Sequence, residues 1–131
     1  MKRTALNPWT WSEQFGFNQG EVVEGATRVL FCAGQTSVDA DGNPQHPGDM
    51  AAQIALAADN LEAVLREAGM SLSNLVRLNF YTTDVDAYFE HAGVIGERTG
   101  AAGVAPAGTL VGVTRLAYPE LMVELEATAV A

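Results

Sequence analysis

The carboxyl-terminal segment has the clearest alternation of apolar and polar residues in the chain. From residue 121 onward every second residue is apolar, which is typical of a strand with one buried face. This apolar face consists of Leu121, Val123, Leu125, Ala127 and Ala129. The opposite face consists of Met122, Glu124, Glu126 and Thr128. The two glutamates either lie on a wet outer surface, or one of them is directed into a cleft.

An amphipathic helix is the second clear pattern, and it occupies residues 47–69. Its apolar positions recur at steps of three and four residues, the spacing of one helix face. They are Met50, Ile54, Ala57, Leu61, Leu65 and Ala68. Gly69 follows the last of them, where a glycine in the left-handed conformation ends many helices.

A second helix is predicted after a strand at residues 75–83, which is rich in β-branched and aromatic side chains. Asp84 or Asp86 is placed to cap this helix at its N-terminus. Its inner face would hold Val85, Tyr88 or Phe89, Ala92 and Ile95. Gly93 and Gly96 lie inside the helix, and each weakens it by about 1 kcal/mol relative to alanine.

The remaining segments predict shorter strands. Residues 15–19 indicate one strand, and residues 28–35 indicate another with apolar side chains on both faces. Residues 100–107 form a small-residue loop, and residues 104–131 fold as two strands around a turn. The order β-β-α-β-α-β-β predicts one α+β domain over residues 1–131. Two helices cover only one face of its sheet, so a second subunit is expected on the other face, as in a homo-oligomer.

Composition and charge narrow the class of partner. The 131 residues are 48% hydrophobic, but no apolar stretch reaches the roughly 18–20 residues of a membrane helix, and the N-terminus does not resemble a signal peptide. A single cysteine, Cys32, forms no intrachain disulfide and favours the cytoplasm. The net charge of −9, with only 7 basic residues, disfavours nucleic acid and anionic membranes. His46 and Asp49 lack a third ligand, which favours helix capping over a metal site, and no cofactor is predicted.

Several motifs, in one order along nearly the whole chain, resemble the RidA (YjgF) family of small imine and enamine deaminases. They are FGFNQG at residues 15–20, FCAGQ at 31–35, the helix at 52–65 with AGMSLSNLVR at 68–77, APA at 105–107, VTRL at 113–116 and VELEATAV at 123–130. The resemblance implies a chorismate-mutase-like fold with a mixed sheet and two helices on one face. It also implies a homotrimer with a barrel-like centre and clefts between subunits.

The resemblance also implies a mechanism. In the family an arginine after Pro-Ala holds the substrate carboxylate, and a glutamate on the last strand holds the water that attacks the C=N carbon. That glutamate corresponds to Glu124, which becomes the expected catalytic residue. Glu126 lies roughly 7 Å further along the strand and is expected to be a solvated rim charge. The expected substrate-binding residues are Phe17, Ala33, Gly34, Tyr88, Gly108, Thr109 and Leu110.

The chain departs from the family pattern where the substrate would be held. Gly108 stands in place of the arginine, Leu110 in place of a cysteine, Phe17 in place of a tyrosine and Ala33 in place of a serine. The pocket is therefore expected to be apolar and acidic, and to suit a neutral or cationic amine or imine without a carboxylate. Replacing Gly108 by arginine is expected to restore hydrolysis of 2-imino acids.

Two other arginines are candidates for the missing cation. Arg115 lies seven residues beyond Gly108, about 23 Å along an extended strand, so it reaches the site only from a neighbouring subunit. Arg98 precedes the small-residue loop and is more typical of a cation that stabilises a helix C-terminus. Trp9 and Trp11 either pack the N-terminal arm onto the fold or cover the pocket.

Three functions follow from these observations. The first is an atypical deaminase that hydrolyses a small imine or enamine to a carbonyl compound and ammonia through water held by Glu124. The alternative is a non-catalytic homotrimer that binds a small metabolite or a protein partner in the same clefts. A ribonuclease activity, which is attached to some members of the family, is disfavoured by the acidic charge.

Overall fold

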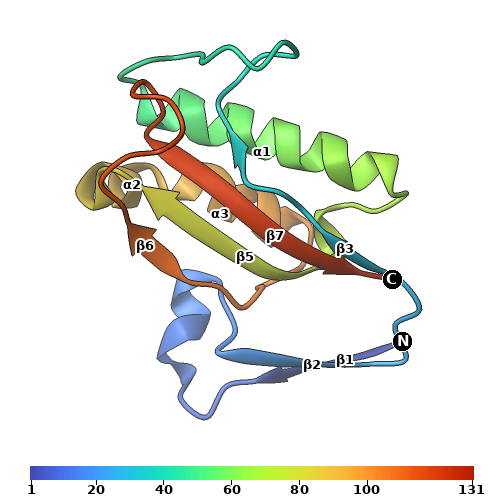
Figure 1. Cartoon of the computed structure of the whole chain (residues 1–131). Coiled ribbons are helices and arrows are strands. Elements are labelled where there is room, and N and C mark those ends of the chain that lie inside the picture. The colour runs from blue at the N-terminus through green and yellow to red at the C-terminus, as the bar shows by residue number, and fades with distance from the viewer.

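Strand β7 (Val123–Val130) lies at the centre of the main sheet (Figure 1). It pairs antiparallel with β3 (Val29–Phe31) and β4 (Gln35–Thr36) on one side and with β5 (Leu75–Thr82) on the other. Strand β6 (Leu110–Gly112) runs parallel to β5 at the sheet edge. The strand order is therefore β3-β7-β5-β6, with β4 also paired to β7.

Three helices pack on one face of this sheet in the computed structural model, which describes residues 1–131. They are α1 (Met50–Glu67), α2 (Val85–His91) and α3 (Gly93–Ala101), and a short 3-10 helix η2 (Leu72–Asn74) precedes β5. The predicted α+β class, with a mixed sheet and helices on one face, is confirmed. The prediction of two helices was one too few, because the second helical segment breaks between α2 and α3. None of the helices is both long and apolar enough to cross a membrane.

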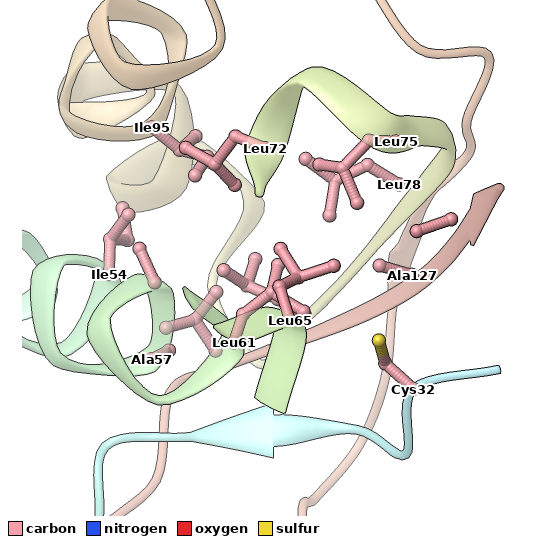
Figure 2. Packing of buried hydrophobic residues seen from close by; sticks show 14 of the residues in the cluster. Cys32, Ile54, Ala57, Leu61, Leu65, Leu72, Leu75, Leu78, Ile95 and Ala127 are labelled. Carbon is pink, nitrogen blue, oxygen red and sulfur yellow. The ribbon is translucent and has the colours of Figure 1, made fainter. Parts of the chain in front are cut away.

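The core lies between α1 and the sheet, and Figure 2 shows its packing. Seventeen buried residues form one cluster, to which the apolar face of β7 and the inner face of α1 contribute. The five apolar positions predicted for the last strand, from Leu121 to Ala129, are all buried, although Leu121 precedes the observed β7. Burial of this kind stabilises the fold by about 25 cal/mol per Å² of apolar surface removed from water.

The ends of the helices follow the predicted caps. The Asp49 side chain accepts a hydrogen bond from the Ala52 amide and begins α1, which confirms its capping role. Gly69, at φ +70°, follows the last turn of the same helix. Asp84, and not Asp86, caps α2 through the Ala87 amide.

The N-terminal residues form a structure that the pattern did not predict. Strands β1 (Lys2–Leu6) and β2 (Gly20–Glu24) make a separate antiparallel hairpin, and the 3-10 helix η1 (Thr10–Phe15) forms part of the connection that joins them (Figure 1). The prediction of a strand at residues 15–19 was wrong, because Gly16 adopts φ +75° and turns the chain there. Arg3 ties the hairpin to the start of β5 by donating to the Ser73 and Leu75 carbonyls.

Two other strand predictions need correction. The strand expected at residues 28–35 is interrupted, and β3 and β4 are separated at Cys32–Gly34. The two C-terminal strands do not pair with each other, because β5 lies between β6 and β7. A long connection therefore joins β6 to β7 around the end of β5 (Figure 1).

The sheet face opposite the helices carries exposed apolar side chains within a single chain. Phe31 is 80% exposed and Val29 is 53% exposed, although both lie on a strand of the main sheet. The partners of these residues on β7 place them on the face that carries Glu124, Glu126 and Thr128. We refer below to this side of the sheet as the open face.

Gln53 fixes the start of β7 against α1. This side chain is fully buried, donates to the His46 and Glu120 carbonyls, and accepts a hydrogen bond from the Met122 amide. One glutamine on the helix thus satisfies three backbone groups from two loops. It holds the backbone immediately before Glu124 in place.

Replacing Gln53 by leucine is expected to lower the free energy of unfolding by about 2–3 kcal/mol, because each buried backbone group left without a partner costs about 1–3 kcal/mol. Urea denaturation measures this change. Gln14→Leu is the control, because Gln14 is exposed and makes no side-chain hydrogen bond. Equal stability of the two variants would show that Gln53 does not anchor β7.

Candidate functional site

A cavity of about 530 Å³ lies at the β6 edge of the sheet, on the same side as the helices. Its walls come from η1 and the residues after it, from β5 and β6, and from α2 and α3. Sixteen residues line it, and none of them is charged. Its volume is within the range of about 300–1,000 Å³ that is typical of small-molecule sites.

The turn after η1 supplies one wall. Trp11 packs edge-to-face against Phe17, with ring centroids 5.7 Å apart, and against Phe15 at 6.4 Å. The Asn18 amide donates to the Ala105 carbonyl, and the Asn18 side chain accepts a hydrogen bond from Asn7. The turn is therefore held against the loop that leads into β6. Of the two tryptophans of the arm, Trp11 lines the cavity and Trp9 does not.

The sheet and helices supply the opposite wall. Tyr88 on α2 is buried against Phe80 on β5, with ring centroids 5.4 Å apart, and burial raises the pKa of its hydroxyl. Its neighbour Phe89 contacts it at 6.0 Å and lines the same cavity. The Thr99 hydroxyl donates its hydrogen bond to the Ile95 and Gly96 carbonyls of its own helix. This wall is therefore mostly apolar.

The backbone at Gly108 lies directly against β5. The Leu78 amide donates to the Ala107 carbonyl at 2.9 Å, and the Phe80 amide donates to the Thr109 carbonyl at 2.9 Å. A Cβ at Gly108 would collide with the Leu78 carbonyl oxygen. The arginine variant expected to hydrolyse 2-imino acids therefore requires β5 to shift at Leu78.

Glu124 lies on the open face, with the sheet between it and the cavity. It is partly buried and is paired in register with Tyr81 and Thr36, and its carboxylate makes no hydrogen bond within the chain. Gly34 lies against it so closely that a Cβ at Gly34 would collide with the Glu124 carboxylate. Desolvation, together with the nearby charge of Glu126, raises the pKa of Glu124.

Glu126 has the opposite environment. Its Oε1 accepts hydrogen bonds from the side-chain amide of Asn79 and from the Tyr81 hydroxyl, both at 3.0 Å. These bonds, with the charge of Arg77, lower the pKa of Glu126, and the same contact raises the pKa of Tyr81. Glu126 remains in contact with solvent, but strand β5 also supplies two donors, which the expectation of a rim charge did not include.

The donors of β5 were missed by the sequence reasoning. Arg77, Asn79 and Tyr81 alternate along β5 and lie on the open face opposite the glutamates. Their period-two spacing was visible in the sequence and could have found them. Asn79 also connects β5 to the residue before β6, because its side-chain Oδ1 accepts a hydrogen bond from the Thr109 backbone amide.

The predicted site residues thus fall into two groups. Phe17, Tyr88, Gly108, Thr109 and Leu110 line the cavity. Glu124 lies on the open face with Gly34 against it, Ala33 is in the connection between β3 and β4, and none of the three lines the cavity. Within one chain these two groups do not form a single pocket.

The two candidate arginines do not line the cavity either. Arg98 forms ion pairs with Asp59 at 2.7 Å and with Glu62 at 2.8 Å, and so joins α3 to α1. Arg115 is exposed in the connection between β6 and β7 and forms no ion pair. The cavity of one chain therefore has no cation to pair with a carboxylate.

Comparison with known proteins gives the family. Residues 14–131 match the family model described as Endoribonuclease L-PSP. The RutC family protein YjgH of Escherichia coli is 30% identical over 117 residues, which cover 89% of this chain and 88% of that protein. The chain belongs to the RidA (YjgF) family. Membership supports a function that involves a small molecule.

Solved structures agree with this assignment to the RidA family. The Rid family protein YyfB of Yersinia pestis, described as a protein of unknown function, is 36% identical with a TM-score of 0.84 over 100% of both chains. The structure of Escherichia coli TdcF with bound serine is 26% identical with a TM-score of 0.71, over 88% of this chain and 87% of that one. The fold expected from the resemblance is confirmed.

The two glutamates are expected to affect stability in opposite directions with pH. The pKa of Glu124 is raised on folding, so the contribution of Glu124 to the stability of the fold is lost as pH rises from its pKa in the unfolded chain to its higher pKa in the folded protein. The pKa of Glu126 is lowered, so its contribution is present above the unfolded value and is lost as pH falls. Compared with the unchanged protein, Glu124→Gln should therefore be more stable at pH 7 than it is at pH 4. Glu126→Gln should be less stable than the unchanged protein at pH 7, and this deficit should shrink at pH 4.

Thermal denaturation of both variants and the unchanged protein between pH 4 and pH 8 measures these shifts. Glu67→Gln on α1 is the control, because Glu67 is exposed and forms no ion pair. Shifts of the same sign for Glu124→Gln and Glu126→Gln would contradict the difference in their environments.

Proposed function

We propose that this protein is an oligomeric deaminase that hydrolyses an imine or enamine of a small molecule without a carboxylate. The observation that carries the proposal is the state of Glu124, a partly buried carboxylate with no hydrogen-bond partner and a raised pKa. A carboxylate in this condition accepts a proton near neutral pH better than an ordinary surface glutamate. Glu126, satisfied by Asn79 and Tyr81, is a poorer base.

The site is proposed to form between two copies of the chain. Glu124 and Gly34 on the open face of one copy meet the cavity of a neighbour, since the sheet separates them within one copy. The exposed Phe31 and Val29, on the same open face as Glu124, support this arrangement, because a second copy would remove them from water. A homotrimer, as the family resemblance implies, is the expected assembly.

The proposed reaction is hydrolysis in two steps. Glu124 takes a proton from a water molecule, whose oxygen forms a bond to the carbon of the protonated imine, C=NH2⁺, while the π electrons move to nitrogen. Glu124 then gives this proton to the amino nitrogen of the carbinolamine. The oxygen lone pair forms the C=O bond as the C–N bond breaks, ammonia leaves, and the hydroxyl proton passes to Glu124 or to water.

The absence of a cation in the cavity determines the proposed substrate class. Losing a charge-assisted contact to a carboxylate costs about 1.5–3 kcal/mol, which is roughly a tenfold to hundredfold change in affinity. A substrate carboxylate would also lie near the Glu124 charge. The TdcF structure contains serine, which carries a carboxylate, so this protein is expected to differ from TdcF in what it holds.

A second candidate is binding without turnover. The cavity lacks the arginine, thiol and tyrosine hydroxyl that the family places there, and Gly108 is fixed against β5. A non-catalytic homotrimer that holds a small metabolite or a protein partner would need only the shape of the cavity. RNA cleavage is not favoured, because the net charge is −9 and three of the 7 cations are already paired with carboxylates.

Replacing Glu124 by glutamine is expected to lower imine hydrolysis by about 100-fold or more, since general-base catalysis contributes about 10²–10⁴ to the rate. The imines are generated in the assay from primary amines by an amine oxidase, and ammonia release above the spontaneous rate is measured. Native mass spectrometry should show the same oligomer for the variant. Glu67→Gln is the matched control and should keep full activity.

Three results would contradict the proposal. Undiminished turnover in Glu124→Gln would remove Glu124 from the mechanism. No turnover of any imine by the unchanged protein would favour the non-catalytic alternative. Faster hydrolysis of a 2-imino acid than of the matching imine without a carboxylate would overturn the proposed substrate class.

A further inference from the structure

Aromatic rings surround the cavity from several elements. Trp11, Phe15 and Phe17 come from η1 and the turn after it, Phe80 comes from β5, and Tyr88 and Phe89 come from α2. These are six of the sixteen lining residues, and the N-terminal group is distant in sequence from the residues of β5 and α2. The aromatic enclosure is therefore formed by the tertiary fold and not by one local run of apolar residues.

Several of these rings have no covering within the chain. Trp11 is 54% exposed, Phe15 is 67% exposed and Phe89 is 64% exposed, although each lines the cavity. Their interplanar angles of 61–78° with neighbouring rings leave faces and edges without an aromatic partner. Planar groups pack well against such rings in edge-to-face or offset geometry.

Gly96 on α3 keeps one wall of the cavity open. It lines the cavity, and a Cβ added to it would meet no atom within 4 Å. The helix itself does not require glycine there, since glycine weakens a helix relative to alanine. Gly100, on the same helix, also has no atom within 4 Å of an added Cβ, but it does not line the cavity.

The polar groups of this cavity are few. The Thr99 hydroxyl is engaged by its own helix, and no lining residue is charged. A small polar ligand would leave most of a 530 Å³ apolar cavity filled with water or empty. A ligand with a large apolar part gains more, because affinity follows the apolar surface removed from water.

From these observations we infer that the ligand of this cavity carries a planar aromatic group, which lies between the rings of η1 and those of β5 and α2. The identity of the substrate rests on the proposed function. Under that function, the ligand is an aryl-substituted imine with its C=N carbon at the cavity mouth. Its protonated form is further stabilised by the ring faces and by the acidic side chain of the neighbouring copy.

Calorimetric titration with two neutral amides tests the inference. Phenylacetamide and acetamide differ only in the phenyl group, and phenylacetamide is expected to bind about tenfold or more tightly. Gly96→Leu should lower the affinity for phenylacetamide by about tenfold, because its side chain occupies the space of the ring. Gly100→Leu is the matched control and should bind phenylacetamide like the unchanged protein.

Equal binding of the two amides, or equal effects of the two leucine variants, would overturn the inference. Native mass spectrometry of both variants tests whether the cavity instead receives a second copy. A change of oligomeric mass in Gly96→Leu alone would show that the cavity is a contact between copies, and would overturn the inference as well.

Turnover distinguishes this inference from the proposed function. The imines of 2-phenylethylamine and ethylamine are compared, and the first is expected to have a kcat/KM at least about tenfold higher. Ring-dependent binding without turnover of either imine would support the aromatic ligand and reject the deaminase. Turnover of both imines at equal kcat/KM would support the deaminase and reject the aromatic ligand.

Discussion

The alternation of side chains along β7 is the constraint on which both the core and the candidate site depend. Val123, Leu125 and Ala127 lie against the helices and are fully or almost fully buried. The same backbone therefore places Glu124 and Glu126 on the other face of the sheet. A slip of one residue would exchange these two sets, so the hydrophobic core and the position of the acid are determined together.

Two glycines allow close contacts that position the groups around the candidate site. Gly34 leaves room for the Glu124 carboxylate beside β4, and Gly108 leaves room for the Leu78 carbonyl of β5. Any larger residue at either position would displace a neighbour. At residue 108 the backbone of β5 occupies the space in which a side chain would begin.

Much of the fold could be predicted from the sequence. The period of β7, the stripe of α1 and the caps at Asp49 and Asp84 are local patterns, and local chemistry determines them. The N-terminal hairpin could not be predicted in this way, because Gly16 and the tertiary contacts of Arg3 decide its path. Strand pairing was also beyond reach, since nothing local places β5 between β6 and β7.

The candidate site was predicted in part for the same reason. Glu124 was identified through its place in a motif, and its raised pKa follows from burial, which a sequence does not show. The hydrogen bonds that set Glu126 apart come from Asn79 and Tyr81, 47 and 45 residues away along the chain. The division of the site between two faces of the sheet became evident only from the tertiary structure.

Mixed oligomers test most directly whether the site is shared between copies. Glu124→Gln removes the acid and Gly96→Leu obstructs the cavity, so oligomers of either variant alone should be impaired in imine hydrolysis. Oligomers assembled from both, verified by native mass spectrometry, should recover turnover, because one copy supplies Glu124 and its neighbour supplies an open cavity. Mixed oligomers no more active than their parents, beside an active unchanged protein, would contradict a site formed between copies.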